Sequence, residues 1–234
     1  MAISTEINKP TISIILAIWG EGYSQFLPQW FEAVQTLERE YNEVVIVCDE
    51  NNINRVLTSI KDFSKVRIRV ENYELEYANY WNRAVDLATS KWIVFCSADD
   101  YFLPQALNEI DAADEAGCNL IIDHLLHKDS LQRQSAVWDE AELNFNFRLM
   151  GANPQTKSLW EAVGGFPFGF QFPDWGFALR LKKSRLVKPF QASTDRIIYD
   201  MGYRRLTMSG ATLPFSDRAK GQDQISNLIK ELEL

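Results

Sequence analysis

The sequence predicts an α/β protein with a doubly wound and mostly parallel sheet. Continuous apolar runs at 12–18, 44–48 and 92–96 have the length and composition of strands that are covered on both faces. Segments with apolar residues at helical spacing lie between these runs. Regular alternation of strands and helices favours a parallel sheet, whose ligand sites lie beyond the carboxyl ends of its strands.

The first two strands end in residues that favour loops. The strand at 12–18 is followed by glycines and then by a helix that is predicted to run from Ser24, its N-cap, to Leu37. The strand at 44–48 stops at 49–52, a run of residues that favour turns and helix caps. In a parallel sheet these loops and the loop after the strand at 92–96 lie at the same edge.

Further elements complete the predicted sheet. Residues 66–70 alternate valine or isoleucine with arginine, which predicts a half-exposed strand near the edge of the sheet. A helix over about 77–89 leads into the strand at 92–96. A short helix is expected over 104–117, followed by an apolar strand at 118–126. Beyond this strand the pattern loosens into short helices and loops.

Composition limits the class of protein. The 234 residues are expected to form a single domain, because an α/β domain of this length can bury a sizeable core. The net charge of -8 without a lysine or arginine cluster argues against nucleic acid or an anionic membrane as partner. No apolar run approaches the about 20 residues of a membrane-spanning helix. Cys48, Cys96 and Cys118 lack the spacing of a disulfide framework or zinc site, so a cytoplasmic location is predicted.

Two adjacent carboxylates, Asp99 and Asp100, follow the strand at 92–96. Carboxylates at such a place are costly unless they reach water or a cation, and oxygen ligands suit Mg²⁺ or Mn²⁺. The alternative is structural: Asp100 would cap the helix near Pro104, and Asp99 would be a solvated turn residue. The sequence signatures of zinc proteases, phosphate-binding loops, dinucleotide-binding loops and serine hydrolases are absent from the chain.

Several segments of the chain form an ordered set. They are the strand at 11–19, Asp49 after the next strand, Asn82 and the strand at 91–95, the Ser97–Pro104 segment, and the Gly164–Trp175 segment. In this order they resemble glycosyltransferase family two, an inverting group with the Rossmann-like GT-A fold. The resemblance covers most of the chain. It implies transfer of a hexose-type sugar from a nucleotide-diphospho-sugar, a UDP-sugar being favoured, to a hydroxyl acceptor.

The resemblance also implies roles for individual residues. Asp99 would bind the Mn²⁺ or Mg²⁺ that bridges the donor diphosphate, with Asp100 as a supporting group. Asp49 would accept a hydrogen bond from the base of the nucleotide, and Asp174 would be the general base for the acceptor hydroxyl. The other residues implied in contact with the nucleotide-sugar are Ala17, Trp19, Asn82, Ser97 and Ala98, and those implied on the acceptor side are Gly165 and Trp175.

Three positions differ from the pattern of the family. Ser97 stands where the first aspartate of its DxD motif is usual, Trp81 where an arginine is usual, and Pro173 where a glutamate is usual. Ser97 and Trp81 favour the main alternative, a non-catalytic module that binds a nucleotide or carbohydrate on the same fold. A sugar-phosphate nucleotidyltransferase is the other alternative, although residues 18–23 lack the arginine of the glycine-rich loop in that class.

The resemblance divides the single domain, 1–234, into parts. Residues of about 11–128 would form the nucleotide-sugar-binding half, and about 129–220 would form the acceptor-side half. Residues 221–234 are predicted to form a C-terminal helix that docks on the body through its apolar stripe.

Three groups of residues each have two interpretations. The phenylalanines of 166–172 would be either core or a platform for an acceptor sugar. His124 and His127 would be either further ligands or ordinary strand and surface residues, and the surrounding apolar residues favour the second interpretation. Arg204 and Arg205 would either approach the diphosphate or lie on a solvated surface.

Overall fold

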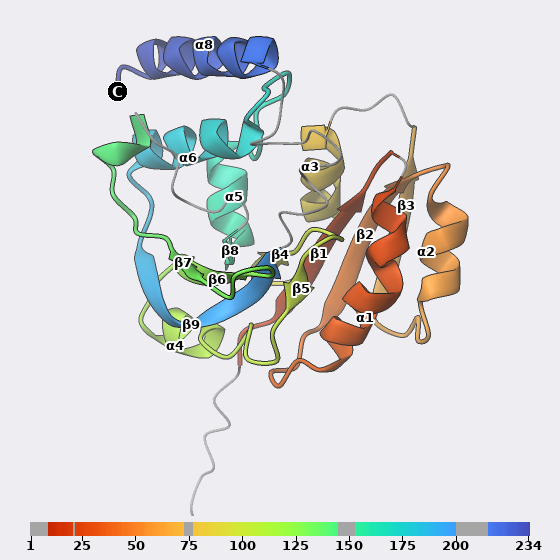
Figure 1. Cartoon of the computed structure of the whole chain (residues 1–234). Helices are drawn as coiled ribbons and strands as arrows, with labels where there is room; N and C mark the ends of the chain where they lie inside the picture. The colour runs from red at the N-terminus through yellow and green to blue at the C-terminus, as the bar shows by residue number, and fades with distance from the viewer. Residues whose placement is uncertain (1–8, 21, 73–76, 145–152, 200–214) are drawn as a thin grey trace, which may run out of the picture.

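The computed structural model describes residues 9–20, 22–72, 77–144, 153–199 and 215–234. These residues form one mixed sheet with helices on both faces (Figure 1), and the strand order is β3-β2-β1-β4-β8-β6-β9-β5, with β7 paired to β6. The strands are β1 (Ile12–Ile18), β2 (Glu43–Asp49), β3 (Val66–Glu71), β4 (Trp92–Phe95), β5 (Tyr101–Phe102), β6 (Leu120–His127), β7 (Arg133–Ser135), β8 (Gln155–Thr156) and β9 (Pro189–Tyr199). The helices are η1 (Tyr23–Phe26), α1 (Leu27–Gln35), α2 (Ile53–Ser59), α3 (Tyr77–Leu87), α4 (Ile110–Glu115), η2 (Glu142–Asn144), α5 (Lys157–Val163), α6 (Pro173–Ser184) and α8 (Phe215–Glu231).

The predicted parallel sheet is confirmed. β1 lies between β2 and β4, and both pairings are parallel. Every residue of these three strands is buried, which explains their continuous apolar runs. β3 is a partly exposed edge strand. The antiparallel pairings, at β5, β7 and β8, are short, so the sheet is mixed but mostly parallel.

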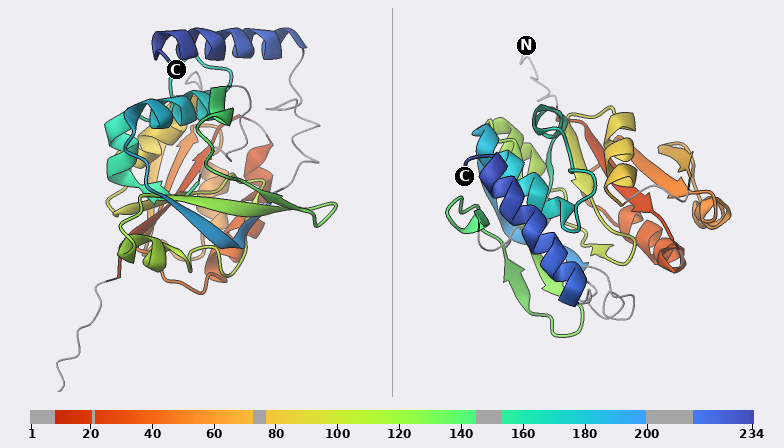
Figure 2. Two further views of the ribbon diagram at one scale, coloured as in Figure 1. Left: turned by 90° about the vertical axis from the view of Figure 1, so that its left-hand side faces the viewer. Right: turned by 90° about the horizontal axis from the view of Figure 1, so that it is seen from above.

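The buried strands face two separate hydrophobic cores. Ile15 and Ala17 of β1 belong to the core formed with α3, α5, α6 and α8. Ile14 and Leu16 belong to the core formed with α1, α2 and α4. Because successive residues of a strand point to opposite faces, the sheet is the middle of three layers (Figure 2).

The C-terminal helix α8 lies beside α6, as both views in Figure 2 show. Ile225 and Leu228 are buried in the core that they share with α6, so the predicted docking is confirmed. The approach is close, because a Cβ at Gly221 would lie 2.4 Å from a ring carbon of Phe172. The helix begins at Phe215, before the predicted start at 221, because the apolar stripe that predicts the helix begins only at Ile225 and does not mark its first turns. No helix in the described part of the chain is long and apolar enough to cross a membrane.

Two helices of the first half begin later than the sequence predicts. Ser24 lies inside the short 3₁₀ helix η1, and α1 begins at Leu27 with Pro28 in its first turn, where proline is well tolerated. Residues 104–109 form consecutive turns, and α4 begins at Ile110.

The strand β9 is not predicted by the sequence. Apart from Ala192, its residues are polar from Gln191 to Arg196, and its burial is only partial, so it lacks the apolar run of a central strand. It nevertheless lies between β6 and β5 and joins the second half of the chain to the sheet. The prediction of short helices and loops beyond 128 is therefore incomplete.

Glu43, at the start of β2, connects three neighbouring strands through a buried carboxylate. Its Oε1 accepts hydrogen bonds from Ser13 Oγ at 2.6 Å and from Thr89 N–H at 2.7 Å. Its Oε2 lies 2.9 Å from Arg67 Nε. Burial raises the pKa of the Glu43 carboxyl, but the hydrogen bonds from Ser13 and Thr89 and the Arg67 charge outweigh burial, so the pKa lies below its usual value.

Replacing Glu43 with glutamine should lower the free energy of unfolding by about 1–3 kcal/mol at neutral pH, because charge-assisted hydrogen bonds are lost. The folded pKa is depressed, so the contribution is present above the unfolded pKa of about 4.3 and is lost as pH falls through the folded pKa. Urea unfolding of both proteins across this pH range should show a stability gap that narrows in acid. A gap that stays constant would contradict this account.

Candidate functional site

Asp49, the last residue of β2, joins the loops that follow β1 and β2. Its Oδ2 accepts a hydrogen bond from Gly20 N–H at 2.7 Å, and its Oδ1 accepts from the N–H groups of Asn51 and Asn52. The Asn52 side-chain amide donates both to the Asp49 carboxylate and to the Gly20 carbonyl. Four donor groups thus fill the roughly four acceptor sites of a carboxylate. Asp49 therefore fixes the two loops to each other at the carboxyl edge of the sheet.

Trp19 follows β1 at the same edge and lies among other aromatic residues. Its ring centroid is 5.6 Å from that of Tyr23, in a stacked arrangement, and 6.2 Å from that of Tyr80 on α3. Trp19 is half-buried, whereas Ala17 is buried in the core beneath it. Of these two predicted contacts, Trp19 is the one whose side chain reaches the surface of the sheet edge.

The acidic turn, defined as Ser97–Asp100, follows β4 at this edge. The N–H of Asp100 donates to the Ser97 carbonyl at 3.1 Å, which closes the turn. Asp99 and Asp100 are 0% and 3% exposed, Ala98 is buried, and Ser97 is half-buried. The interpretation of Asp99 as a solvated turn residue is therefore wrong. Asp100 does not cap the next helix either, because the N-cap residue of α4 is Glu109.

The two carboxylates of the acidic turn suit a divalent cation that arrives with a phosphate-containing ligand. Mg²⁺ is commonly held by one or two protein carboxylates together with phosphate oxygens and water, and Mn²⁺ accepts the same kind of ligands. In the part of the chain that the structure describes, no group of three or more His, Cys, Asp or Glu residues could hold a metal. Asp99 and Asp100 thus fit a partial site that a diphosphate would complete.

Asn82 of α3 contacts the glycine-rich loop, defined as residues 164–172, which follows α5. Its Nδ2 donates to the Phe166 carbonyl, and its Oδ1 accepts from the Phe166 N–H, both at 2.9 Å. A Cβ at Gly165 would lie 2.6 Å from Asn82 Oδ1 and 2.9 Å from Trp160 Nε1, and the φ of Gly165 is +63°. Only glycine fits such a position without a clash and backbone strain. We call this two-point contact the Asn82 latch.

An aromatic cluster connects β4 with the helices of the second half. Trp160 of α5 has ring centroids 5.2 Å from Phe95 of β4 and 4.8 Å from Phe166, and Phe166 lies 5.5 Å from Phe177 of α6. Phe166 is buried, so its interpretation as an acceptor platform is wrong. Phe168 on the same loop is 62% exposed. The cluster therefore links the strand before the acidic turn to α6.

Asp174 lies in the first turn of α6, where a negative side chain is favourable. It is half-buried, and its Oδ1 accepts a hydrogen bond from the Trp175 N–H at 2.9 Å. The Trp175 indole N–H donates to the Leu143 carbonyl at 2.7 Å and so fixes the start of α6 to η2. A Cβ at Gly176 would lie 2.7 Å from Pro167 Cγ, so the glycine-rich loop packs on this turn.

The remaining sequence interpretations concern histidines and arginines. His124 and His127 lie on β6, and His124 is buried with Nε2 at 2.9 Å from a backbone carbonyl of β9. These are the strand positions that the sequence favours. Arg204 and Arg205 lie outside the described residues.

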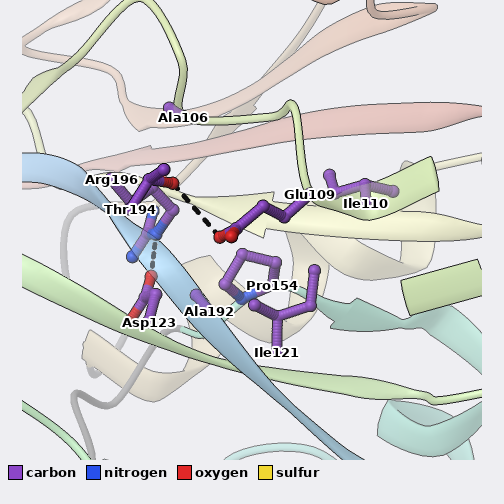
Figure 3. A pocket seen from close by; sticks show the side chains of 9 residues that line it. All are labelled: Ala106, Glu109, Ile110, Ile121, Asp123, Pro154, Ala192, Thr194 and Arg196. Atoms are coloured by element: carbon purple, nitrogen blue, oxygen red, sulfur yellow. Dashed lines mark hydrogen bonds and ion pairs between the residues drawn. The ribbon is translucent and has the colours of Figure 1, made fainter. Parts of the chain in front are cut away.

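One buried ion pair is missed by the sequence prediction. Arg196 of β9 and Asp123 of β6 are 4% and 1% exposed, and Arg196 Nε contacts Asp123 Oδ2 (Figure 3). Burial raises the pKa of the Asp123 carboxyl, and the Arg196 charge opposes that rise. The Arg196 guanidinium also donates to the Phe95 carbonyl at 2.6 Å. A lone charged residue inside an apolar strand, as Asp123 is, is the sequence signal that points to such a pair.

The strand order of the sheet is that of an α/β protein of the GT-A type. The model of the family described as "Glycosyl transferase family 2" matches residues 13–174. The chain therefore belongs to glycosyl transferase family 2.

A curated relative and several solved structures are similar to this chain. An uncharacterized glycosyltransferase of Methanocaldococcus jannaschii is 26% identical over 108 residues, which cover 44% of this chain and 37% of the relative. The matched stretch is thus well under half of that relative's length.

S. aureus TarS 1–349 matches with a TM-score of 0.64 and 13% identity over 95% of this chain and 71% of that chain. Its complex with UDP-GlcNAc matches with a TM-score of 0.67 and 14% identity over 96% and 68%. At these identities the likeness concerns the fold, and it confirms the predicted GT-A fold.

Replacing Gly165 with alanine should destabilise the protein more than replacing Gly169, a matched control. Both glycines have positive φ, +63° and +72°, so both variants carry backbone strain of about 1–3 kcal/mol. Only at Gly165 would the new Cβ also collide with the Asn82 latch, because nothing lies within 4 Å of a Cβ at Gly169. Urea unfolding measures both losses. Equal losses would contradict the tight contact between Asn82 and Gly165.

Proposed function

We propose that this chain is an inverting glycosyltransferase that moves a hexose-type sugar from a UDP-sugar to a hydroxyl acceptor with Mn²⁺ or Mg²⁺. The observation that carries the proposal is the pair of buried carboxylates, Asp99 and Asp100, on the turn after β4 of a family 2 glycosyltransferase. TarS, which has a similar fold, has been crystallised with UDP-GlcNAc, and this supports UDP-GlcNAc as the first donor to test.

Asp99 and Asp100 are the residues that would hold the cation, with Asp99 as the main ligand. When bound, the cation neutralises the negative charge that develops on the diphosphate leaving group. Both residues are buried, and a backbone hydrogen bond closes the turn that carries their carboxylates. Ser97 contributes a neutral hydroxyl where the family usually has a third carboxylate, so we expect cation binding to depend strongly on the diphosphate.

The nucleotide side of the site is proposed to lie at the loops after β1 and β2. Trp19 presents a half-buried aromatic ring there, and rings of this kind pack well against planar bases. Asp49 shapes this side by holding both loops. A direct hydrogen bond from the base to Asp49 stays a prediction. It would have to replace one of the hydrogen bonds that the Asp49 carboxylate now accepts.

Asp174 is the proposed general base. A carboxylate across the cleft from the diphosphate can take the proton of the acceptor hydroxyl while that hydroxyl attacks the anomeric carbon from the opposite face, which inverts the configuration. Asp174 is half-buried and therefore accessible, and the aromatic cluster ties its helix to the strand before the acidic turn. The indole N–H of Trp175 already donates a hydrogen bond to the Leu143 carbonyl. We therefore propose that an acceptor sugar would contact the face of the Trp175 ring.

Two further parts of the proposal come from the sequence. The cytoplasmic location rests on the spacing of the cysteines, of which Cys48 and Cys96 are buried thiols. The family match favours sugar transfer over the nucleotidyltransferase alternative. A non-catalytic binding module is the remaining rival, and the experiment below separates the two.

Replacing Asp174 with asparagine should lower the rate of sugar transfer at least about 100-fold, because the general base is lost. The affinity for the donor should stay almost unchanged, because the proposed role of Asp174 is to take the proton of the acceptor hydroxyl and not to bind the nucleotide. The measurements are UDP release from a panel of UDP-sugars with Mn²⁺, with water or candidate sugars as acceptors, and calorimetry for donor affinity.

The matched control is Asp111→Asn, which removes a carboxylate from the first turn of α4 on the other face of the sheet. This variant should keep the wild-type rate. Full turnover by the Asp174 variant would rule out its role as the base. A wild-type protein that binds nucleotide-sugars but never releases UDP would favour the non-catalytic module.

A further inference from the structure

A bulge in β9 inserts Arg196 into the pairing of β9 with β6. His124 lies opposite Asp195, and the next residue of β6, Leu125, lies opposite Ile197. Arg196 is therefore the extra residue on β9. β-Bulges redirect individual side chains and are frequent beside active sites. Here the redirected side chain is a buried guanidinium that reaches β4.

Arg196 contacts both ends of the segment that contains the acidic turn. Its Nη1 donates to the Phe95 carbonyl at 2.6 Å, at the end of β4. Its own carbonyl accepts a hydrogen bond from the Leu103 N–H at 2.9 Å. Asp99 and Asp100 lie between these two contact points, so one residue closes the loop that carries both carboxylates.

Asp123 holds the other side of the guanidinium. Figure 3 shows the Asp123 carboxylate facing Arg196 at the wall of a small pocket, which has room for about one water molecule. On the α4 side of this pocket Glu109 accepts a hydrogen bond from Thr194 Oγ1 at 3.1 Å. Breaking a buried Arg–Asp pair is costly, whereas replacing the whole pair by apolar residues is often neutral for stability. Because apolar residues could give a similar free energy of unfolding, a contribution to stability alone does not explain why this buried pair is present.

We infer that Arg196 is a positioning residue for the carboxylates of the acidic turn, with Asp123 as the residue that orients its guanidinium. The planar guanidinium suits this role because separate nitrogens reach the Asp123 carboxylate and the Phe95 carbonyl at once. That this positioning preforms a cation site at Asp99 rests on the proposed function. The effect of Arg196 on the conformational order of the loop, by contrast, can be measured in the chain without ligand.

The experiment measures hydrogen–deuterium exchange of the backbone amides of 96–103 in the full chain without ligand. The double variant Asp123→Leu with Arg196→Met replaces the ion pair by apolar side chains, so its thermal midpoint should stay close to that of the wild type. Exchange at 96–103 should be at least about tenfold faster, because the loop loses its contact at Phe95. Affinity for UDP with Mn²⁺ should fall about tenfold as well.

A matched control removes a different arginine pair, between Arg133 of β7 and Asp195 of β9. Arg133 Nε lies 2.6 Å from Asp195 Oδ1, next to Arg196, but its side chain is 46% exposed. The Arg133→Met variant should leave exchange at 96–103 at the wild-type rate. A rise in this control equal to that of the double variant would overturn the inference.

A second variant decides the question if the double variant does not fold. Arg196→Lys keeps the charge beside Asp123 but lacks the second arm for the Phe95 carbonyl, so exchange at 96–103 should again rise. Wild-type exchange in a folded variant of either kind would overturn the inference. Failure of the wild type to bind any UDP-sugar would instead count against the proposed function, and the exchange result would still decide the role of Arg196.

Discussion

The geometry of the site depends on Phe95, the last residue of β4. Its backbone pairs with β1 in the middle of the sheet, its ring packs against Trp160 and Phe166, and its carbonyl accepts a hydrogen bond from Arg196. The acidic turn begins two residues later, so contacts on both faces of the sheet limit its position. Electrostatic stabilisation of a leaving diphosphate requires such preorganised groups, because reorganising them during the reaction would consume the gain.

The second constraint joins the two halves of the chain. The Asn82 latch connects α3, which packs on β1 and β2, to the loop before α6. On the outer side, the Gln224 side chain of α8 accepts from the Gln171 N–H and donates to the Gly169 carbonyl. The glycine-rich loop is thus held from α3 and from α8. The position of the proposed base on α6 therefore depends on α3, which also packs on the strands of the proposed nucleotide side.

The buried parallel strands could be predicted from the sequence, because a strand covered on both faces must be apolar throughout. The order of the motifs identified the family and drew attention to Asp99. Burial of Asp99 could not be predicted, since an aspartate after a strand can be either a solvated turn residue or a buried metal ligand, and the sequence does not distinguish the two. The Asn82 latch and the Arg196 pair join residues 84 and 73 positions apart, and packing in three dimensions sets such contacts. The strand β9 was not predicted for a related reason. Its polar residues are hydrogen-bonded to residues of other elements, and the sequence does not reveal these contacts.

The central claim is that the acidic turn binds a divalent cation together with the diphosphate of the donor. Calorimetric titration of UDP into the wild type and into Asp99→Ala, with and without Mn²⁺, tests it most directly. In the wild type, Mn²⁺ should raise the affinity for UDP at least about tenfold, and this coupling should vanish in Asp99→Ala. Equal affinity with and without Mn²⁺ in the wild type, or intact coupling in the variant, would contradict the claim.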